Sequence, residues 1–213
     1  TGYTDDGLGG NFANRHDFLL SANGGTTQAT FGINDSFTFS TIVTLAVGSV
    51  APRKEAGIRL NSNVTGDALF IVNSDAGEIV AFGGGAPFYS FGNNGGGNGY
   101  VPGTPILLGI TMIGGGAPGV PNTIEYFIDR TPADPAGVVS SGPLAFSNLE
   151  GGAVAYNVGM YVQGAPNLTN SAEFVNGTFA DIRYSATPIP EPASIATAVI
   201  GLLGLGAMAR KRS

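Results

Sequence analysis

The feature that most constrains the fold of this chain is a series of short apolar runs that alternate with a period of two. Glycine, asparagine and proline separate the runs. The pattern is clearest in residues 36–47, where four apolar side chains share one face: Phe37, Phe39, Val43 and Leu45. A half-buried strand alternates in this way, whereas a helix repeats every 3.6 residues. No stretch before residue 187 has a convincing helical period, so the sequence predicts an all-β body.

Seven further runs have the same β character, which gives eight strands or more: residues 56–62, 68–74, 78–83, 105–113, 123–130, 153–163 and 177–185. This number of short strands with turn residues between them predicts a two-layer antiparallel β-sandwich or jelly roll. The motif NSDAG at 73–77 is typical of a hairpin turn, and the glycine-rich stretch 92–99 of a surface loop. Nothing indicates a second domain within residues 1–186.

Composition excludes several functions. Before Pro188 the chain has six basic and fourteen acidic residues, so the body carries about −8. No basic cluster is present to neutralise phosphates, which argues against binding to nucleic acid. The chain has no cysteine, and this rules out disulfides, thiolate metal sites and cysteine nucleophiles.

The last 27 residues, 187–213, differ from the body. Pro190, Glu191 and Pro192 precede seventeen uncharged residues at 193–209, and the basic end 210–213 follows with Arg210, Lys211 and Arg212. A helix over 193–209 would span about 26 Å, close to the thickness of a hydrocarbon core. The basic end would stay cytoplasmic, which places the acidic body outside the inner membrane.

This tripartite order resembles the PEP-CTERM sorting signal of Gram-negative bacteria. The resemblance implies export by the Sec route and anchoring through 193–209. An exosortase, a membrane-embedded cysteine protease, would then recognise the tail and remove it. It also implies a final location at the cell surface or in an extracellular matrix of polysaccharide. A plain membrane anchor with a proline-rich linker is the alternative.

The body resembles the concanavalin A-like sandwiches that include laminin G-like domains. The resemblance rests on the order of the runs at 55–84 and on the closing strand, where Asp181, Ile182, Arg183 and Tyr184 follow an Asp-apolar-Arg-aromatic pattern. It implies a lectin-like fold and leaves the activity open.

A search for catalytic residues nominates none. His16 is the only histidine, and its neighbour Asp17 would point to the opposite face of a strand, which does not suit a triad. Glu125 and Asp129 share a face of one predicted strand but are about 13 Å apart, beyond glycosidase spacing. Carboxylates from different strands could still meet, and the sequence leaves this possibility open.

Two binding sites are predicted as alternatives to ordinary structural roles. Asp5, Asp6 and Asn11 offer oxygen ligands for calcium in a glycine-rich stretch, where turn formation explains them equally well. Four aromatic residues flank the glycine-rich loop and could stack on sugar rings or pack beneath it: Phe88, Tyr89, Phe91 and Tyr100.

Together these features predict a non-catalytic, exported surface or matrix protein that binds polysaccharide. The alternatives are a polysaccharide-modifying hydrolase and a self-associating structural protein on the same fold.

The sorting hypothesis makes a direct prediction. Protein recovered from native cells should end near Pro190–Pro192 and lack the peptide that contains Arg210, Lys211 and Arg212. Intact mass and terminal peptide mapping measure this. An uncut tail in the membrane fraction of a strain that carries the protease would contradict the hypothesis.

Overall fold

The structure is a computed structural model. It describes residues 2–5, 14–32, 35–62, 66–92, 99–114, 122–134, 137–146, 156–164 and 173–186. Of the predicted features, the calcium ligands Asp6 and Asn11 and the whole tail 187–213 lie outside these residues. So do the side chains of β1, including that of Asp5.

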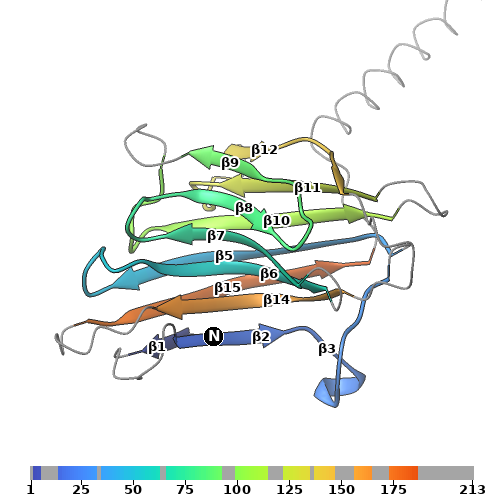
Figure 1. Cartoon of the computed structure of the whole chain (residues 1–213), viewed down its shortest axis with the longest axis horizontal. Helices are drawn as coiled ribbons and strands as arrows, with labels where there is room; N and C mark the ends of the chain where they lie inside the picture. The colour runs from blue at the N-terminus through green and yellow to red at the C-terminus, as the bar shows by residue number, and fades with distance from the viewer. Residues whose placement is uncertain are drawn as a thin grey trace, which may run out of the picture.

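Most strands among the described residues form two antiparallel sheets that pack face to face (Figure 1), and a separate pair of strands forms a small third sheet. One sheet has six strands in the order β2-β14-β6-β7-β8-β9. The other has seven, in the order β1-β15-β5-β10-β11-β12, with β13 also paired to β11. The strands are β1 (Gly2–Asp5), β2 (Asn14–Leu19), β3 (Ser21–Ala22), β4 (Thr27–Gln28), β5 (Phe37–Val47), β6 (Lys54–Ser62), β7 (Gly66–Asn73), β8 (Ile79–Gly83), β9 (Tyr89–Gly92), β10 (Pro105–Ile113), β11 (Asn122–Asp129), β12 (Val138–Ser140), β13 (Leu144–Phe146), β14 (Tyr156–Gly164) and β15 (Val175–Ser185).

The predicted two-layer sandwich is therefore confirmed, and each of the eight predicted runs contains a strand. The sequence does not predict the shortest strands, because their alternation of apolar and polar residues is too brief to detect. In β2, moreover, the outward positions carry charged side chains, which conceal the apolar partners. The predicted hairpin turn joins β7 to β8, where the Asn73 side-chain oxygen accepts hydrogen bonds from the backbone N–H groups of Ala76 and Glu78.

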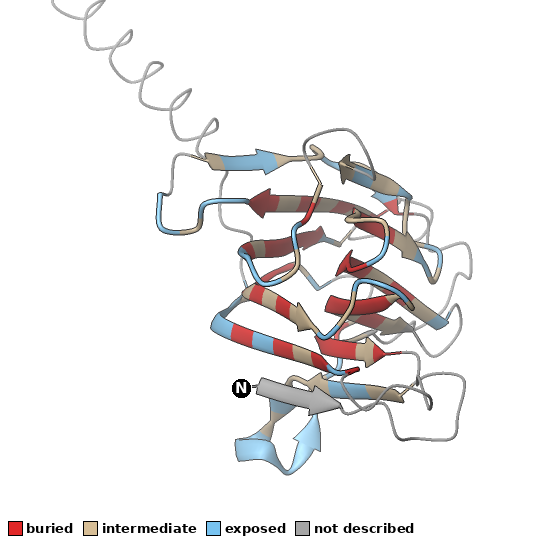
Figure 2. Cartoon of the chain, turned by 90° about the vertical axis from the view of Figure 1, so that its left-hand side faces the viewer, coloured by how far each residue is buried: buried red, intermediate tan, exposed pale blue. Residues whose placement is uncertain are grey.

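The core lies between the sheets, and Figure 2 shows buried residues alternating along the strands. The four apolar side chains that define the pattern in β5 are fully buried, as predicted. Ile58 of β6, Phe70 of β7 and Met160 of β14 enter the same core from the six-stranded sheet. Their outward-pointing neighbours form the opposite face of that sheet.

No helix among the described residues is long and apolar enough to span a membrane. The predicted helix over 193–209 lies outside those residues.

A glycine allows a close backbone approach in the middle of the six-stranded sheet. A Cβ atom added at Gly57 would lie 2.2 Å from the carbonyl oxygen of Phe70 and 2.8 Å from the Cα atom of Ile71. Both contacts are with backbone, so no side-chain rotation could relieve them.

Gly57→Ala should therefore destabilise the fold by about 1–3 kcal/mol, the usual cost of overpacking. Gly32→Ala is the matched control, because its nearest contact would be an ordinary 3.6 Å from a side-chain oxygen of Asp35. Urea unfolding of both variants measures the difference. Equal midpoints for the two variants would contradict the assigned register.

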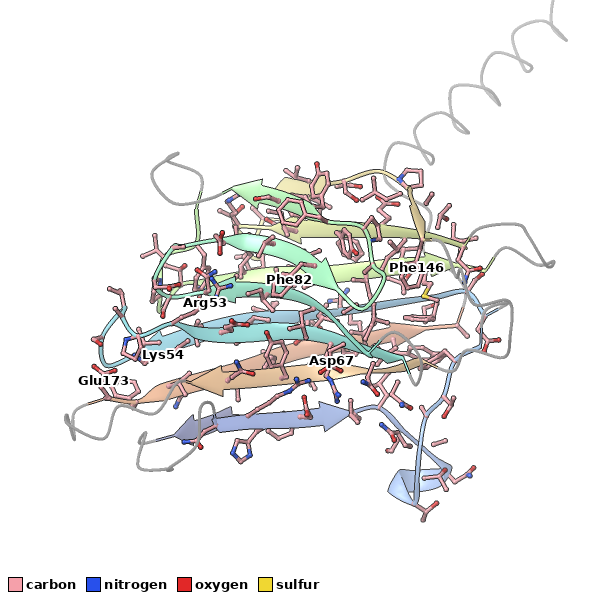
Figure 3. All side chains as sticks on the ribbon, viewed as in Figure 1. Arg53, Lys54, Asp67, Phe82, Phe146 and Glu173 are labelled. Atoms are coloured by element: carbon pink, nitrogen blue, oxygen red, sulfur yellow. The ribbon has the colours of Figure 1, made fainter. Side chains whose placement is uncertain are left out.

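A buried ion pair closes one end of the sandwich. Lys54 Nζ lies 2.6 Å from Glu173 Oε2, and both side chains are at most 4% exposed. Figure 3 shows the two residues together at that end. Lys54 also donates to the backbone oxygens of Ser49 and Pro52, each at 3.0 Å. The hydrogen bonds from Lys54 and Ser49 lower the pKa of Glu173.

A lowered pKa means that this carboxylate stabilises the fold above its unfolded pKa, and that the contribution is lost as the pH falls through the folded value. The stability of the wild type should therefore drop at acid pH, and Glu173→Gln should flatten this part of the profile.

Lys54→Met should cost about 3 kcal/mol at neutral pH, because it leaves a buried charge uncompensated. Denaturant midpoints of the wild type and of both variants, measured across the pH range, test these two predictions. If stability falls as steeply at acid pH in Glu173→Gln as in the wild type, the lowered pKa of Glu173 is refuted.

Candidate active site

The outward face of the six-stranded sheet carries two polar clusters and an apolar strip. Strand alternation places them there, because each residue that points outward is adjacent to one that enters the core. Figure 3 labels three residues of this face, Arg53, Asp67 and Phe82.

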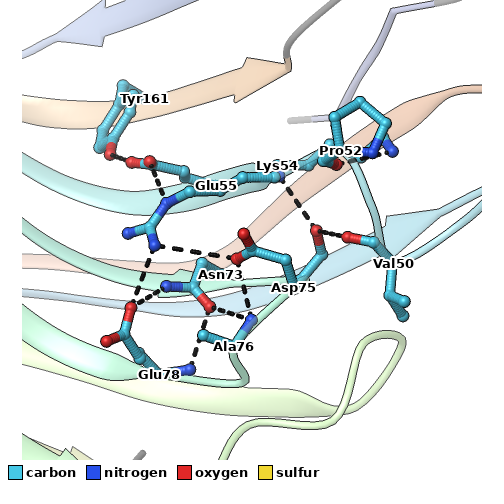
Figure 4. Close-up of polar contacts among 11 residues, drawn as sticks. Val50, Pro52, Lys54, Glu55, Asn73, Asp75, Ala76, Glu78 and Tyr161 are labelled. Carbon is cyan, nitrogen blue, oxygen red and sulfur yellow. Dashed lines mark hydrogen bonds and ion pairs between the residues drawn. The ribbon is translucent and has the colours of Figure 1, made fainter. Parts of the chain in front are cut away.

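The first cluster, called here the Arg53 cluster, consists of Arg53, Glu55, Glu78, Asn73 and Asp75 (Figure 4). Arg53 Nε donates to Glu55 Oε1 at 2.7 Å, and Nη1 donates to Glu78 Oε2 at 3.1 Å. Asn73 Nδ2 also donates to Glu78 Oε2, at 2.5 Å, and Asp75 lies 3.8 Å from Arg53 Nη1. One guanidinium thus joins Glu55 of β6 to Glu78, which lies in the turn just before β8.

Tyr161 adjoins this cluster from β14. Its hydroxyl donates to Glu55 Oε2 at 2.6 Å, and Arg15 lies over its ring at 5.2 Å from the centroid. The tyrosine side chain is fully buried. Burial and the nearby charge of Glu55 raise the pKa of Tyr161 well above its ordinary value, so the hydroxyl keeps its proton at neutral pH.

The second cluster, called here the Asp67 cluster, consists of Asp67, Arg15, Arg59, Asp17 and Asn61. Arg59 Nη2 and Arg15 Nη1 each lie 2.7 Å from an oxygen of Asp67, and Asn61 donates to it at 2.6 Å. Partial burial would raise the pKa of Asp67, but the donors Arg59, Arg15 and Asn61 outweigh it and lower the pKa. Asp17 contacts both arginines, at 3.1 and 3.4 Å.

An apolar strip lies on the same face. Ile71 and Val80 are buried together with Tyr161, and Leu69 and Phe82 pack against them while remaining half-buried. An apolar strip on an outward sheet face is unusual, and it offers a surface against which the carbon–hydrogen face of a sugar ring could pack.

The Arg53 cluster brings together the two carboxylates that glycosidic cleavage requires. Because Glu55 Oε1 and Glu78 Oε2 both accept from adjacent nitrogens of one planar guanidinium, the two oxygens are at most about 8 Å apart. Glycosidases place their carboxyl groups about 5 to 9.5 Å apart. The separation of Glu55 and Glu78 therefore does not exceed the upper limit for a two-carboxylate site.

The sequence predicts neither glutamate as a site residue. Their side chains meet only because the β6–β7 and β7–β8 pairings place the end of one strand beside the turn that leads into another. No local motif marks them. The sole hint is that Glu55 and Glu78 each stand at the edge of an apolar run, in a chain that is only 11% charged.

The structure places the residues that the sequence does single out as follows. His16 and Asp17 point to opposite faces of β2, as predicted, since only Asp17 belongs to the outward-facing Asp67 cluster. Glu125 of β11 accepts a hydrogen bond from the hydroxyl of Ser140 of β12, and both strands belong to the seven-stranded sheet. Within the described residues, no group of histidine, aspartate and glutamate could hold a metal ion.

The four aromatic candidates separate into two kinds. Phe88 is 71% exposed. Tyr89 and Phe91 pack on each other, with centroids 4.8 Å apart, and against the core. Tyr100 is buried, its hydroxyl donating to the backbone oxygen of Thr104 at 2.9 Å. Of these four residues, only Phe88 is well exposed and available to stack on a sugar.

No protein-family model and no curated protein matches the chain. Solved structures do match it. The alginate lyase from Corynebacterium sp. superposes with a TM-score of 0.61 at 11% identity, over 86% of this chain and 75% of that one. A family 7 alginate lyase in complex with product gives a TM-score of 0.57 at 8% identity, over 86% and 78%. The alginate lyase AlgAT5 of polysaccharide lyase family 7 gives 0.53 at 12% identity, over 86% and 76%.

These matches contradict two predictions from the sequence. The expected non-catalytic carbohydrate-binding or adhesion protein, and with it the expectation that the chain is no enzyme, is overturned because the proteins that share this sandwich are enzymes acting on a polysaccharide. Spacing along single strands could not reveal the pair of Glu55 and Glu78, although the sequence left open that carboxylates distant along the chain could meet. Its alternative, a polysaccharide-modifying enzyme, agrees better with these matches.

Proposed function

We propose that this chain is an enzyme that cleaves a polysaccharide on the outward face of its six-stranded sheet. The observation that carries the proposal is the bridge between Glu55 and Glu78 through Arg53, beside the buried hydroxyl of Tyr161. The likeness of the whole sandwich to alginate lyases supports the same class of activity.

In the proposed reaction, Glu78 is the general acid and Glu55 the anionic partner. Glu78 has the more exposed side chain, at 30% against 11%, so it is the carboxyl group that a bound chain reaches more easily. It would protonate the glycosidic oxygen as the bond to the anomeric carbon breaks. Glu55, oriented by Tyr161 and Arg53, would attack that carbon or take a proton from the attacking water. The separation of at most about 8 Å between the carboxylate oxygens is compatible both with direct attack by Glu55 and with attack by water.

A second candidate is elimination, which the names of the structural neighbours favour. A base would remove the proton beside a uronate carboxyl group, the oxygen of the linkage would leave, and a carbon–carbon double bond would form. The hydroxyl of Tyr161, which donates to Glu55 at 2.6 Å, would have to leave that partner to give its proton to the leaving oxygen. The two reactions give different products, since only elimination creates an unsaturated sugar.

We further propose that the enzyme is exported and that its tail carries a sorting signal that an exosortase removes. The order of Pro190-Glu191-Pro192, the uncharged run and the basic end supports this. A site outside the cytoplasm agrees with a polymeric sugar as substrate.

Incubation of the full chain with a panel of polysaccharides tests the activity. Reducing ends report hydrolysis, and ultraviolet absorbance of the new double bond reports elimination. Glu55→Gln and Glu78→Gln should each reduce turnover at least about 100-fold, the usual contribution of a positioned acid or base. Tyr161→Phe should reduce it as well.

Arg183→Ala is the control, because its ion pair with Asp181 is exposed on β15 of the other sheet. Thermal unfolding shows whether each variant is folded. Full activity in folded Glu55→Gln and Glu78→Gln variants would refute the proposed site.

A further inference from the structure

We propose that the polysaccharide bound at this face is uncharged. The inference rests on the first reaction of the proposed function, hydrolysis, because elimination requires a charged uronate, and it names the class of substrate. It departs from what the names of the structural neighbours suggest, because the charges of this chain are arranged unfavourably for a polyanion.

Most basic residues of the body already have acidic partners. Residues 1–186 contain six, and five form ion pairs with carboxylates of the same chain: Arg15, Arg53, Lys54, Arg59 and Arg183. The sixth, Arg130, donates to the backbone oxygen of Phe91 at 2.8 Å. A polymer with repeated carboxylates would therefore compete with internal carboxylates at five of the six basic residues.

Acidic groups outnumber basic ones on the outward face itself. Among the described residues, the two polar clusters contain three arginines, Arg15, Arg53 and Arg59. They contain five carboxylates: Asp17, Glu55, Asp67, Asp75 and Glu78. Since charges within about 8 Å of one another are poorly screened at physiological salt, the face repels a polyanion. The body as a whole, at about −8, adds to this repulsion.

One guanidinium nitrogen of this face is out of reach of a bound polymer. Nη2 of Arg15 is buried and has no hydrogen-bond partner among the described residues. The guanidinium lies over the ring of Tyr161 and is held by Asp67 and Asp17. A chain lying on the surface would have to move Arg15 before it could use this nitrogen.

The same face suits an uncharged sugar chain. Carboxylates are strong acceptors for sugar hydroxyls, and those of Glu78 and Asp75 are about one-third exposed. The half-buried side chains of Leu69 and Phe82 offer apolar contact to ring carbon–hydrogen groups. None of these contacts requires a negative charge on the polymer.

Affinity electrophoresis of the full chain tests the inference separately from turnover. Each native gel would contain one polymer. The neutral polymers are a mixed-linkage glucan, a xylan and a glucomannan, and the acidic polymers are alginate and polygalacturonate. We expect at least one neutral polymer to retard the protein and neither acidic polymer to do so. The double substitution Asp17→Asn and Asp75→Asn removes two carboxylates from the face, so it should introduce retardation by the acidic polymers.

The outcomes distinguish the two proposals when the same polymers are also assayed for cleavage. Retardation by a neutral polymer without cleavage of any would refute the enzyme and leave the class of ligand standing. Cleavage or retardation by an acidic polymer alone would overturn the inference and leave the enzyme standing. The absence of retardation by every neutral polymer would also overturn it.

Discussion

The structure depends on the burial of one side of every long strand between two sheets. In β6, β7 and β14 the alternation that sends Ile58, Phe70 and Met160 into the core necessarily turns their neighbours outward. Glu55, Asp67 and Tyr161 thus reach a common outer face as a consequence of core packing. A slip of one residue in any of these strands would exchange core and site, so the candidate site is as strongly specified as the core.

Within the outer face, charge pairing takes the place of apolar packing. Two arginines clamp Asp67, and Arg53 holds Glu55 beside Glu78. Such pairs add little stability when exposed, but here they are partly covered and share partners, which fixes side-chain positions. Tyr161 lies between the two clusters, with Arg15 over its ring and Glu55 at its hydroxyl. The buried hydroxyl of Tyr161 thus orients Glu55, which shares Arg53 with Glu78.

Much of the fold was predictable, because alternation is a local property. Runs such as Pro105–Ile113 coincide with a strand, and the turn after Asn73 has the residues that a hairpin needs. Predictions that required knowledge of neighbours were less successful. Tyr89 and Phe91 look like loop aromatics in the sequence, but β9 pairs with β8 and carries them towards the core. The charged outward positions of β2 kept that strand out of the eight apolar runs, although His16 and Asp17 were expected on opposite faces of a strand.

Residue types and their short-range order were sufficient to predict the class of fold, the acidic character of the body and the unusual composition of the tail. Only the tertiary structure decided which carboxylates meet. Glu55 and Glu78 share one guanidinium, and Arg15 reaches Asp67 across 52 residues of chain. Strand pairing brings together residues that are distant in sequence, and no local pattern records which strands become neighbours.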